Sequence, residues 1–333
     1  MHHPRRIHRA VRLGASGLAC VAMLTAFGAR VTAQEPGTER INRTFDLGSS
    51  GRLELSNVAG EIVVTTVSGS TLTIDAVKRV RPRGNESTAE ALASLTVEFD
   101  QRGDRLEVRT EHSRGRGRQR ASVDYTVSVP AGTSVSLHSV SGDLEVTGVQ
   151  GELRTETVSG QVRIRSAGAL SVAKSVSGDV RIETARATNT AEIGSVSGDI
   201  VAEDLEAERL EVETVSGEIE LRRVASERVE LSTVSGDLDF EGPLAPNGRY
   251  DLQSHSGDLV LRLSSDDVGF ELTAETFSGS IETDVPLTLR GGTGARDDRG
   301  RGRRGQSMRG TYGDGSARIE VRTFSGDLEI LQR

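Results

Sequence analysis

Apolar and polar residues alternate along most of this chain in short runs, and the runs come in pairs on either side of a Ser-Gly dipeptide. Residues 210–221, for example, read LEVETVSGEIEL. Apolar or small residues occupy every second position before and after the glycine, which predicts two β-strands that each bury one face. The apolar positions are even-numbered from Leu210 but odd-numbered from Val215 onward. This change of phase predicts a bend between the strands and places Val215 in the apolar set of the second strand.

The Ser-Gly bend recurs at a nearly constant interval. Successive glycines are separated by 18, 18, 20, 19, 19, 21 and 22 residues, and the last one follows after 47 residues. These glycines are Gly142, Gly160, Gly178, Gly198, Gly217, Gly236, Gly257, Gly279 and Gly326. A period near 20 residues indicates stacked coils, and glycine tolerates the positive φ of a tight corner. The sequence therefore predicts an all-β fold: a single elongated parallel β-helix or β-solenoid, right-handed, with coils of 18–22 residues and Ser-Gly-Asp corners.

The composition fits a narrow core and a single domain. Aromatic residues make up 3% of the 333 residues and tryptophan is absent, as expected for thin coils filled by Val, Leu, Ile and Thr. A solenoid grows along one axis, so a chain of this length needs no second core. We predict regular coils over residues 131–333 and irregular first coils over residues 34–130, where hairpins form an N-terminal cap. A short helix is expected near residues 87–95, where Ser-Thr-Ala-Glu precedes apolar residues.

The N-terminal segment has the features of an export signal. Several arginines and histidines precede an apolar run over residues 13–29, which predicts a cleaved secretory signal peptide over residues 1–33. A lipoprotein signal at Cys20 and a twin-arginine signal at Arg5-Arg6 are weaker alternatives, because their flanking residues depart from those patterns. Cleavage would remove the only cysteine. We therefore expect an exported protein that is periplasmic, cell-surface or secreted, with no membrane span after cleavage.

Two loops rich in arginine and glycine interrupt the strand pattern, one at residues 112–120 and one at about residues 291–315. We interpret the second loop as an insertion in one coil that accounts for the 47-residue step. Positive charge attracts polyanions, so six arginines are candidate contacts: Arg114, Arg116, Arg118, Arg301, Arg303 and Arg304. Nucleic acid is not an expected partner, because the net charge is -8 and no aromatic residues lie among the arginines to stack on bases. Envelope polymers or acidic glycans are the expected polyanions, and a solvated loop without a ligand is the alternative.

The residue after the corner glycine is acidic in seven units: Asp143, Asp179, Asp199, Glu218, Asp237, Asp258 and Asp327. Stacked coils would align these residues in a column that could hold Ca²⁺, which prefers oxygen ligands. However, Gln161 and Ser280 interrupt the column, and the Gly-Gly-x-Gly-x-Asp pattern of calcium-binding β-rolls is absent. We therefore interpret the carboxylates as acceptors for backbone amides in an Asx-type turn, and we predict no metal and no cofactor.

An enzyme is the main rival class, because parallel β-helices also include proteins that cleave polysaccharides. Glycosidic cleavage needs paired carboxylates in a cleft, usually with aromatic platforms for the sugar rings. The chain has no tryptophan and three tyrosines. His138 and His255 fall near Ser-Gly corners, where neither coincides with a recurring acidic cluster. We therefore expect a protein that is not an enzyme and has no catalytic residues.

Several segments resemble those of a known family. The segment LELSNVAGEIVV at residues 53–64 is followed by YTVSVPAG at residues 125–132 and then by repeated Thr-Val-Ser-Gly-Asp units. This order resembles the bacterial "putative adhesin" family of β-strand-repeat proteins, a family of unknown function, over about residues 40–332. The resemblance implies a β-helical solenoid without recognised catalytic residues. It also implies a structural or adhesin-like binding module of the cell envelope, with an envelope polymer or protein as partner and an accessory role in envelope-stress sensing as the alternative.

Overall fold

Strands make up most of the part of the chain that the structure describes. In the computed structural model this part comprises residues 37–82, 87–112, 120–264, 268–289 and 305–332. It contains 25 strands and one short helix, so the predicted all-β class is confirmed. The predicted signal peptide of residues 1–33 lies outside the described residues. No helix within the described ranges is long and apolar enough to cross a membrane.

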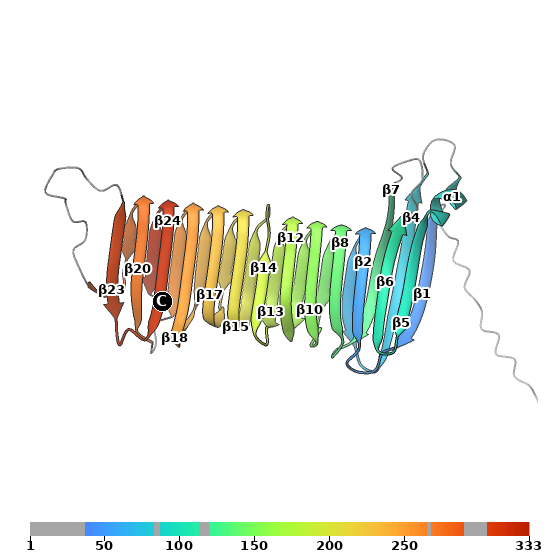
Figure 1. The fold of residues 1–333 in the computed structure, drawn as a ribbon, viewed down its shortest axis with the longest axis horizontal. Helices are drawn as coiled ribbons and strands as arrows, with labels where there is room; N and C mark the ends of the chain where they lie inside the picture. The colour runs from blue at the N-terminus through green and yellow to red at the C-terminus, as the bar shows by residue number, and fades with distance from the viewer. Residues whose placement is uncertain (1–36, 83–86, 113–119, 265–267, 290–304, 333) are drawn as a thin grey trace, which may run out of the picture. The chain divides into compact units, whose positions relative to one another are not determined.

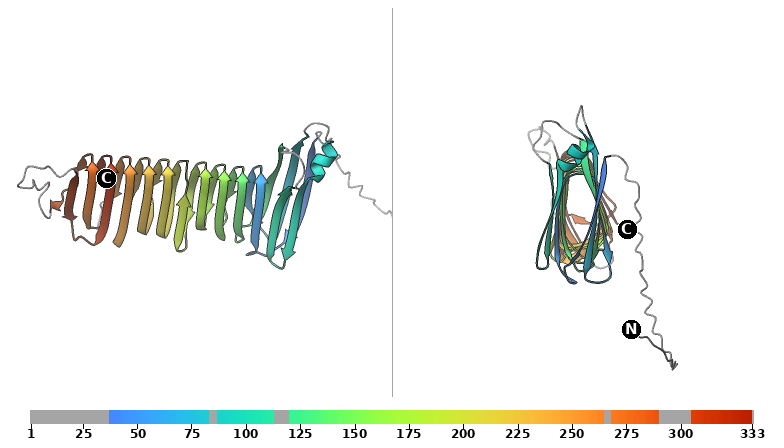
Figure 2. Two further views of the ribbon diagram at one scale, coloured as in Figure 1. Left: turned by 45° about the horizontal axis from the view of Figure 1, so that its top comes forward. Right: turned by 90° about the vertical axis from the view of Figure 1, so that its right-hand side faces the viewer.

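The strands form two layers, here called sheet I and sheet II, that face each other across the core (Figure 1, and Figure 2, right). In order of pairing, sheet I contains β5 (Leu95–Arg102), β6 (Arg105–His112), β2 (Arg52–Ala59), β8 (Ser134–Ser141), β10 (Glu152–Ser159), β12 (Ala169–Ser177), β14 (Thr190–Gly194), the second half of β15 (Ile200–Ser216), β17 (Ala225–Ser235), the second half of β18 (Leu238–Ser256), β24 (Ala317–Ser325), β20 (Phe270–Ser278), β23 (Gln306–Tyr312) and β22 (Thr288–Leu289). Sheet II contains β1 (Thr38–Asp46), β4 (Thr71–Arg81), β7 (Arg120–Pro130), β3 (Ile62–Val67), β9 (Leu144–Thr147), β11 (Val162–Ala167), β13 (Val180–Arg186), the first half of β15, β16 (Ile219–Arg222), the first half of β18, β19 (Leu259–Ser264), β25 (Leu328–Gln332) and β21 (Ile281–Thr283). Strands β15 and β18 run through both layers and join them.

Neighbouring coils pair in parallel and in register, so that equivalent residues form columns along the stack. Ser159 pairs with Ser141 on one side and with Ser177 on the other. The strands of sheet II between β3 and β25 show the same parallel register. Each position of the repeat, buried or exposed, is therefore presented once per coil at the spacing of paired strands, about 4.8 Å.

At both ends of the stack, the order of the coils departs from the order of the chain. The β2–β3 coil lies between β6–β7 and β8–β9. The β24–β25 coil is the last in the sequence, yet it lies between β18–β19 and β20–β21. Antiparallel strands follow at each end: β1, β4 and β5 at one, and β23 and β22 at the other. They cover strand edges that would otherwise be open.

This order corrects the interpretation of the 47-residue step. The coil of Gly326 does not simply follow the coil of Gly279, because its glycine packs on Gly257 while Gly279 packs on Gly326. Within the predicted insertion, residues 306–312 form β23, which pairs antiparallel with β20. Residues 290–304 lie outside the described residues.

The single helix, α1 (Thr88–Ala93), lies where the sequence predicted one. The hydroxyl of Ser87 accepts a hydrogen bond from the backbone N–H of Glu90 at 3.2 Å, and the Glu90 carboxylate accepts one from the Ser87 N–H at 3.0 Å. This reciprocal pair satisfies two amides that a helix start leaves without intrahelical partners.

The core between the sheets consists mainly of aliphatic columns, and its largest buried side chains are Tyr125, Tyr250, Phe240 and Phe270. The Tyr125 hydroxyl lies 2.6 Å from the Thr110 hydroxyl, and burial raises the pKa of Tyr125 to about 12. The Tyr250 hydroxyl donates to the Ser226 carbonyl at 2.9 Å and accepts from the Ala245 N–H at 2.7 Å. Both phenols thus satisfy their polar atom inside an apolar interior.

A second bend lies near the end of the sheet II strands. Its residues form a column with φ between 52° and 86°: Gly148, Ser166, Thr184, Asp204 and Arg223. The left-handed conformation reverses the alternation of side chains, so that Ile164 and Ala167 both face the core although three positions separate them. Each of these five coils therefore changes phase twice, once at the glycine corner and once here.

Candidate functional site

The predicted corner glycines lie in one column, where the backbones of successive coils approach closely. A Cβ at any of the nine positions would come within 2.0–2.3 Å of the carbonyl oxygen of the glycine in a neighbouring coil. The φ angle lies between 146° and 157° at six of them. Backbone contact between coils is therefore the common reason for glycine, and the positive φ expected from the sequence is a secondary one.

Hydroxyls and carboxylates connect each corner to the next one. On the inner side, the Thr157 hydroxyl donates to the Gly142 carbonyl at 3.4 Å. On the outer side, the Asp143 carboxylate accepts the backbone N–H of Gln161 in the next coil at 2.9 Å. The same outer bond recurs at Asp179, Asp199, Asp237, Asp258 and Asp327. The expected Asx-type turn is thus corrected: the carboxylates accept backbone amides, but those of the neighbouring coil.

The corner carboxylates do not converge on a cation site. Among the described residues, no group of three or more His, Cys, Asp or Glu side chains could hold a metal ion. Burial raises the pKa of Glu218, and the neighbouring carboxylates of Asp199 and Asp237 raise it further. The column therefore concentrates negative charge along the outer edge of the corners.

An exposed apolar column runs beside these corners, and we call it the corner ladder. It comprises the residue two positions before each corner glycine: Val58, Val140, Val158, Val176, Val196, Val215, Val234, His255, Phe324 and Phe277. Its valines and phenylalanines are 37–52% exposed. The assignment of Val215 to the buried set of the second strand is wrong, because the first strand continues through it with its side chain outward.

Sequence reasoning missed the corner ladder, although the sequence carries a signal for it. Val215 has the parity of Glu211 and Glu213, which lie on the outward face of the first strand. An apolar residue that keeps the parity of charged neighbours in coil after coil is an exposed column, unless the strand ends before it. The wrong prediction came from placing the phase change before Val215 rather than at the glycine.

Aromatic rings continue the ladder at one end. The His255 and Phe324 rings stack at 5.0 Å with an interplanar angle of 10°. Phe324 and Phe277 stack at 4.8 Å and 6°. These spacings match the distance between paired strands, so parallel pairing of the coils is what stacks the rings.

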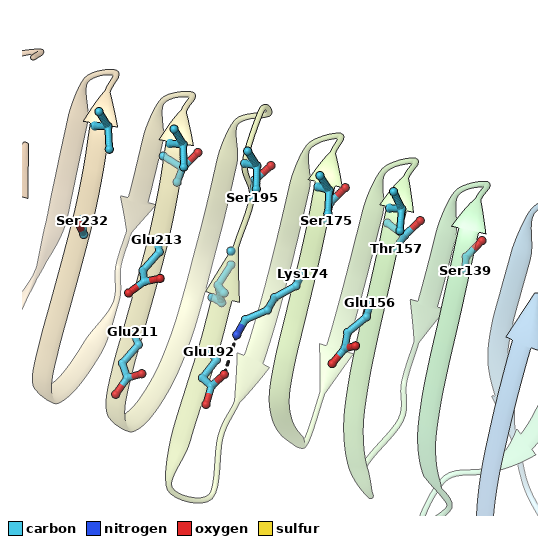
Figure 3. A pocket seen from close by; sticks show the side chains of 18 of the residues that line it. Ser139, Glu156, Thr157, Lys174, Ser175, Glu192, Ser195, Glu211, Glu213 and Ser232 are labelled. Carbon is cyan, nitrogen blue, oxygen red and sulfur yellow. Dashed lines mark hydrogen bonds and ion pairs between the residues drawn. The ribbon is translucent and has the colours of Figure 1, made fainter.

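A groove of about 860 Å³ runs along the strand side of the ladder (Figure 3). Ladder valines from Val158 to Val234 form its apolar wall. Its charged side chains are four carboxylates and one ammonium: Glu156, Glu192, Glu211, Glu213 and Lys174. The Lys174 ammonium crosses to Glu192 on the next strand at 2.8 Å, which lowers the pKa of Glu192.

Gly194 deepens the middle of the groove. It occupies the column position held by Lys174 in one neighbouring coil and by Glu213 in the other. The stem of Lys174 lies over this gap, with its Cγ 3.5 Å from where a Gly194 Cβ would be. Glu213 has no ion-pair partner among the described residues, so the groove retains uncompensated negative charge at this point.

The His138 imidazole lies beside a carboxylate, which the sequence did not predict. Its Nδ1 lies 3.4 Å from the Glu156 carboxylate of the next coil, and its Nε2 lies 3.2 Å from the Ser136 hydroxyl. This order of groups resembles a nucleophile, base and acid. However, backbone amides of paired strands point along the sheet toward neighbouring strands, so the amides of these strands are not directed at the face where the carbonyl oxygen of an acyl group on Ser136 would lie.

The predicted polyanion contacts Arg114, Arg116, Arg118, Arg301, Arg303 and Arg304 lie outside the described residues. The other arginines on strands mostly pair with carboxylates. Arg165, for example, bonds Glu145 at 2.6 Å and Glu183 at 3.2 Å, one coil to each side. These pairs of opposite charge neutralise much of the strand faces, and they include Glu156 and Glu211 of the groove, which pair with Arg154 and Arg209.

The fold and the corner ladder define a repeat protein whose distinctive surface is a linear array of exposed apolar side chains. The chain belongs to the family described as Toastrack DUF4097, whose model matches residues 61–331. No curated protein matches the sequence. The predicted resemblance to a family of adhesin-like proteins of unknown function is thereby confirmed.

Several solved structures are similar to this chain. One is described as "a putative adhesin" from Bacteroides fragilis, with 14% identity, a TM-score of 0.38, and coverage of 90% of this chain and 99% of that chain. A "putative adhesin" from Parabacteroides distasonis has 11% identity, a TM-score of 0.38, and coverage of 89% and 97%. A "putative lipid binding protein" from the same organism has 10% identity, a TM-score of 0.39, and coverage of 89% and 97%.

Proposed function

We propose that this protein is a non-enzymatic, adhesin-like binding module of the bacterial cell envelope, exported by a cleaved signal peptide. Its scaffold is a right-handed parallel β-solenoid with coils of about 20 residues. The corner ladder is its binding surface. The observation that carries this proposal is the exposure of an apolar side chain at the same outward position of coil after coil.

An exposed apolar column has a cost that a purely structural role does not explain. Contiguous apolar surface promotes unwanted association, and on a soluble protein it commonly marks an interaction site. The neighbouring outward column contains charged residues such as Glu156, Lys174 and Glu213, so polar residues are compatible with this face. Retention of valine and phenylalanine at the ladder position is therefore best explained by a partner that covers them.

The test compares two triple variants that make the same chemical change on opposite faces. The ladder variant carries Val158→Ser, Val196→Ser and Val234→Ser. The control variant carries the same change at the outward valines of sheet II: Val63→Ser, Val201→Ser and Val260→Ser. Both are screened with the parent protein against immobilised envelope polymers, acidic glycans and solubilised envelope proteins.

We expect the parent and the control variant to retain a partner that the ladder variant loses. A protein partner would favour a role in envelope sensing, and a polymer would favour adhesion. Equal binding by all three proteins would refute the ladder as the binding surface.

A further inference from the structure

Carboxylates flank the central part of the corner ladder on both sides. On the corner side lie Asp179, Asp199, Glu218 and Asp237. On the strand side lie the four carboxylates of the groove. Arg154 pairs with Glu156, Lys174 with Glu192 and Arg209 with Glu211, which leaves Glu213 without an ion pair among the described residues. An occupant that covers the valines must therefore present an apolar stripe bordered by positive charge.

The spacing of the ladder favours one type of backbone. Ladder residues repeat at the distance of paired strands, about 4.8 Å, as the ring spacings of 4.8 and 5.0 Å illustrate. An α-helix with apolar residues at heptad spacing presents one about every 5.2 Å along its axis. An extended peptide presents side chains on one face about every 6.7 Å and would lose register within a few coils.

We infer that the corner ladder and its groove bind an amphipathic α-helix whose apolar stripe packs on the valines and whose flanking lysines or arginines pair with the corner carboxylates on one side and with Glu213 on the other. This inference rests on the proposed binding function and adds the chemistry of the partner. From Val140 to Val234 the ladder makes five steps, about 24 Å. A helix of about 16 residues covers that length.

The same charges argue against a second copy of this chain as the occupant. Two ladders packed face to face would bring their acidic columns together, and like charges across an interface oppose association. They also argue against an acidic polymer at this surface, because the corner carboxylates would repel it and Arg154, Lys174 and Arg209 already pair with carboxylates of the groove. A basic helix satisfies both the apolar wall and the acidic borders.

The experiment uses three synthetic peptides of about 18 residues as probes. The first combines leucine and lysine with the leucines at helical spacing, the second replaces every lysine with glutamate, and the third alternates leucine and lysine to favour a strand. Binding to the full chain is measured by fluorescence anisotropy at low and high salt, together with the helical circular dichroism of the bound peptide.

We expect the helical leucine–lysine peptide to bind, to gain helicity and to weaken with salt, and the other two peptides to bind at least about tenfold more weakly. The ladder variant should weaken binding by about tenfold or more, while the control variant should not. The change Glu213→Gln with Glu218→Gln should reduce the salt dependence. Its matched control, Glu282→Gln with Glu329→Gln on sheet II, should leave it unchanged.

Two results would overturn the inference, and they differ from failure of the proposed function. Equal binding of the glutamate peptide or of the alternating peptide would refute a basic helix as the occupant. Binding of the helical peptide that the ladder variant does not weaken would place it elsewhere. If the peptide does not bind but the ladder variant still loses an envelope partner, the proposed function stands and this inference fails.

Discussion

The corner column makes a quantitative prediction about the substitution Gly198→Ala. The new Cβ would lie 2.3 Å from the Gly178 carbonyl oxygen, whereas ordinary contact begins at 3.4 Å, so the two backbones must separate by about 1 Å. This movement weakens two hydrogen bonds that cross the gap between these coils, from the Val180 N–H to Asp199 O and from the Ser197 N–H to Val176 O, both at 2.9 Å. Overpacking costs about 1–3 kcal/mol and each weakened bond about 1 kcal/mol. We expect a loss of about 3 kcal/mol of stability.

The matched control is Gly194→Ala, four positions earlier in the chain. Its Cβ would meet only ordinary contacts at 3.5 Å or more, and its φ is not positive. Alanine should therefore be neutral or stabilise by about 0.5–1 kcal/mol, because glycine in a strand loses more backbone entropy on folding. Urea unfolding measures the change in the free energy of unfolding for each variant, and hydrogen exchange over residues 170–217 shows where in the stack the change occurs. A Gly198→Ala protein within about 0.5 kcal/mol of the parent would refute the argument from close backbone approach.

Three further predictions concern titratable groups. The pKa of Glu218 is raised in the folded state, so ionisation of this carboxyl lowers stability as the pH rises through that pKa. Glu218→Gln should therefore raise the midpoint of thermal unfolding at pH 7 and lose this advantage below pH 4.5. The hydrogen bonds from Ser280 lower the pKa of Asp327, and the stability that results is present above pH 3.8 and is lost as the pH falls. Asp327→Asn should therefore lower the midpoint of thermal unfolding at pH 7 and match the parent protein in strong acid. Tyr125→Phe should cost about 1–2 kcal/mol, because it leaves the buried Thr110 hydroxyl without its partner. The same change should remove a phenol that titrates near pH 12 in the alkaline absorbance spectrum.

Much of the fold follows from local pattern. Alternation in segments such as residues 210–221 predicts strands with one buried face, and the recurring glycine predicts where the chain turns. The helix at Thr88–Ala93 follows from its capping residues. These features depend on interactions within a few residues, which the sequence displays directly.

The order of the coils could not be predicted in the same way. Every coil offers its neighbours the same in-register backbone and similar aliphatic residues. Pairing of β24 with β18 and pairing of β24 with the other edge of β20 are therefore expected to be equally favourable. The stacked rings of the corner ladder do not decide the order either, because His255, Phe277 and Phe324 would also stack if the coils followed the order of the chain. The antiparallel strand β23 does distinguish the two orders, since it occupies the outer edge of β20 and leaves β24 the inner one.

The candidate site was missed for a different reason. In the sequence, charged and reactive residues stand out, such as the arginines between residues 112 and 120, whereas the surface that stands out in the structure is built from valine. Its position depends on where the phase changes, and that point is set by contact between coils at the corner glycine. The parity of Glu211 and Glu213 places Val215 on the outward side only if the strand continues through it, and the sequence does not show where the strand ends.

A repeat scaffold also determines how its function should respond to mutation. A catalytic centre depends on a few groups that act together, so loss of one abolishes most of the activity. The corner ladder instead presents one modest apolar contact per coil, and coils far apart share no partners. Changes at Val158 and Val234 should therefore add in free energy, and binding should weaken in steps with the number of ladder positions altered. A loss of binding that is complete after one substitution would point to a discrete site and against a linear one.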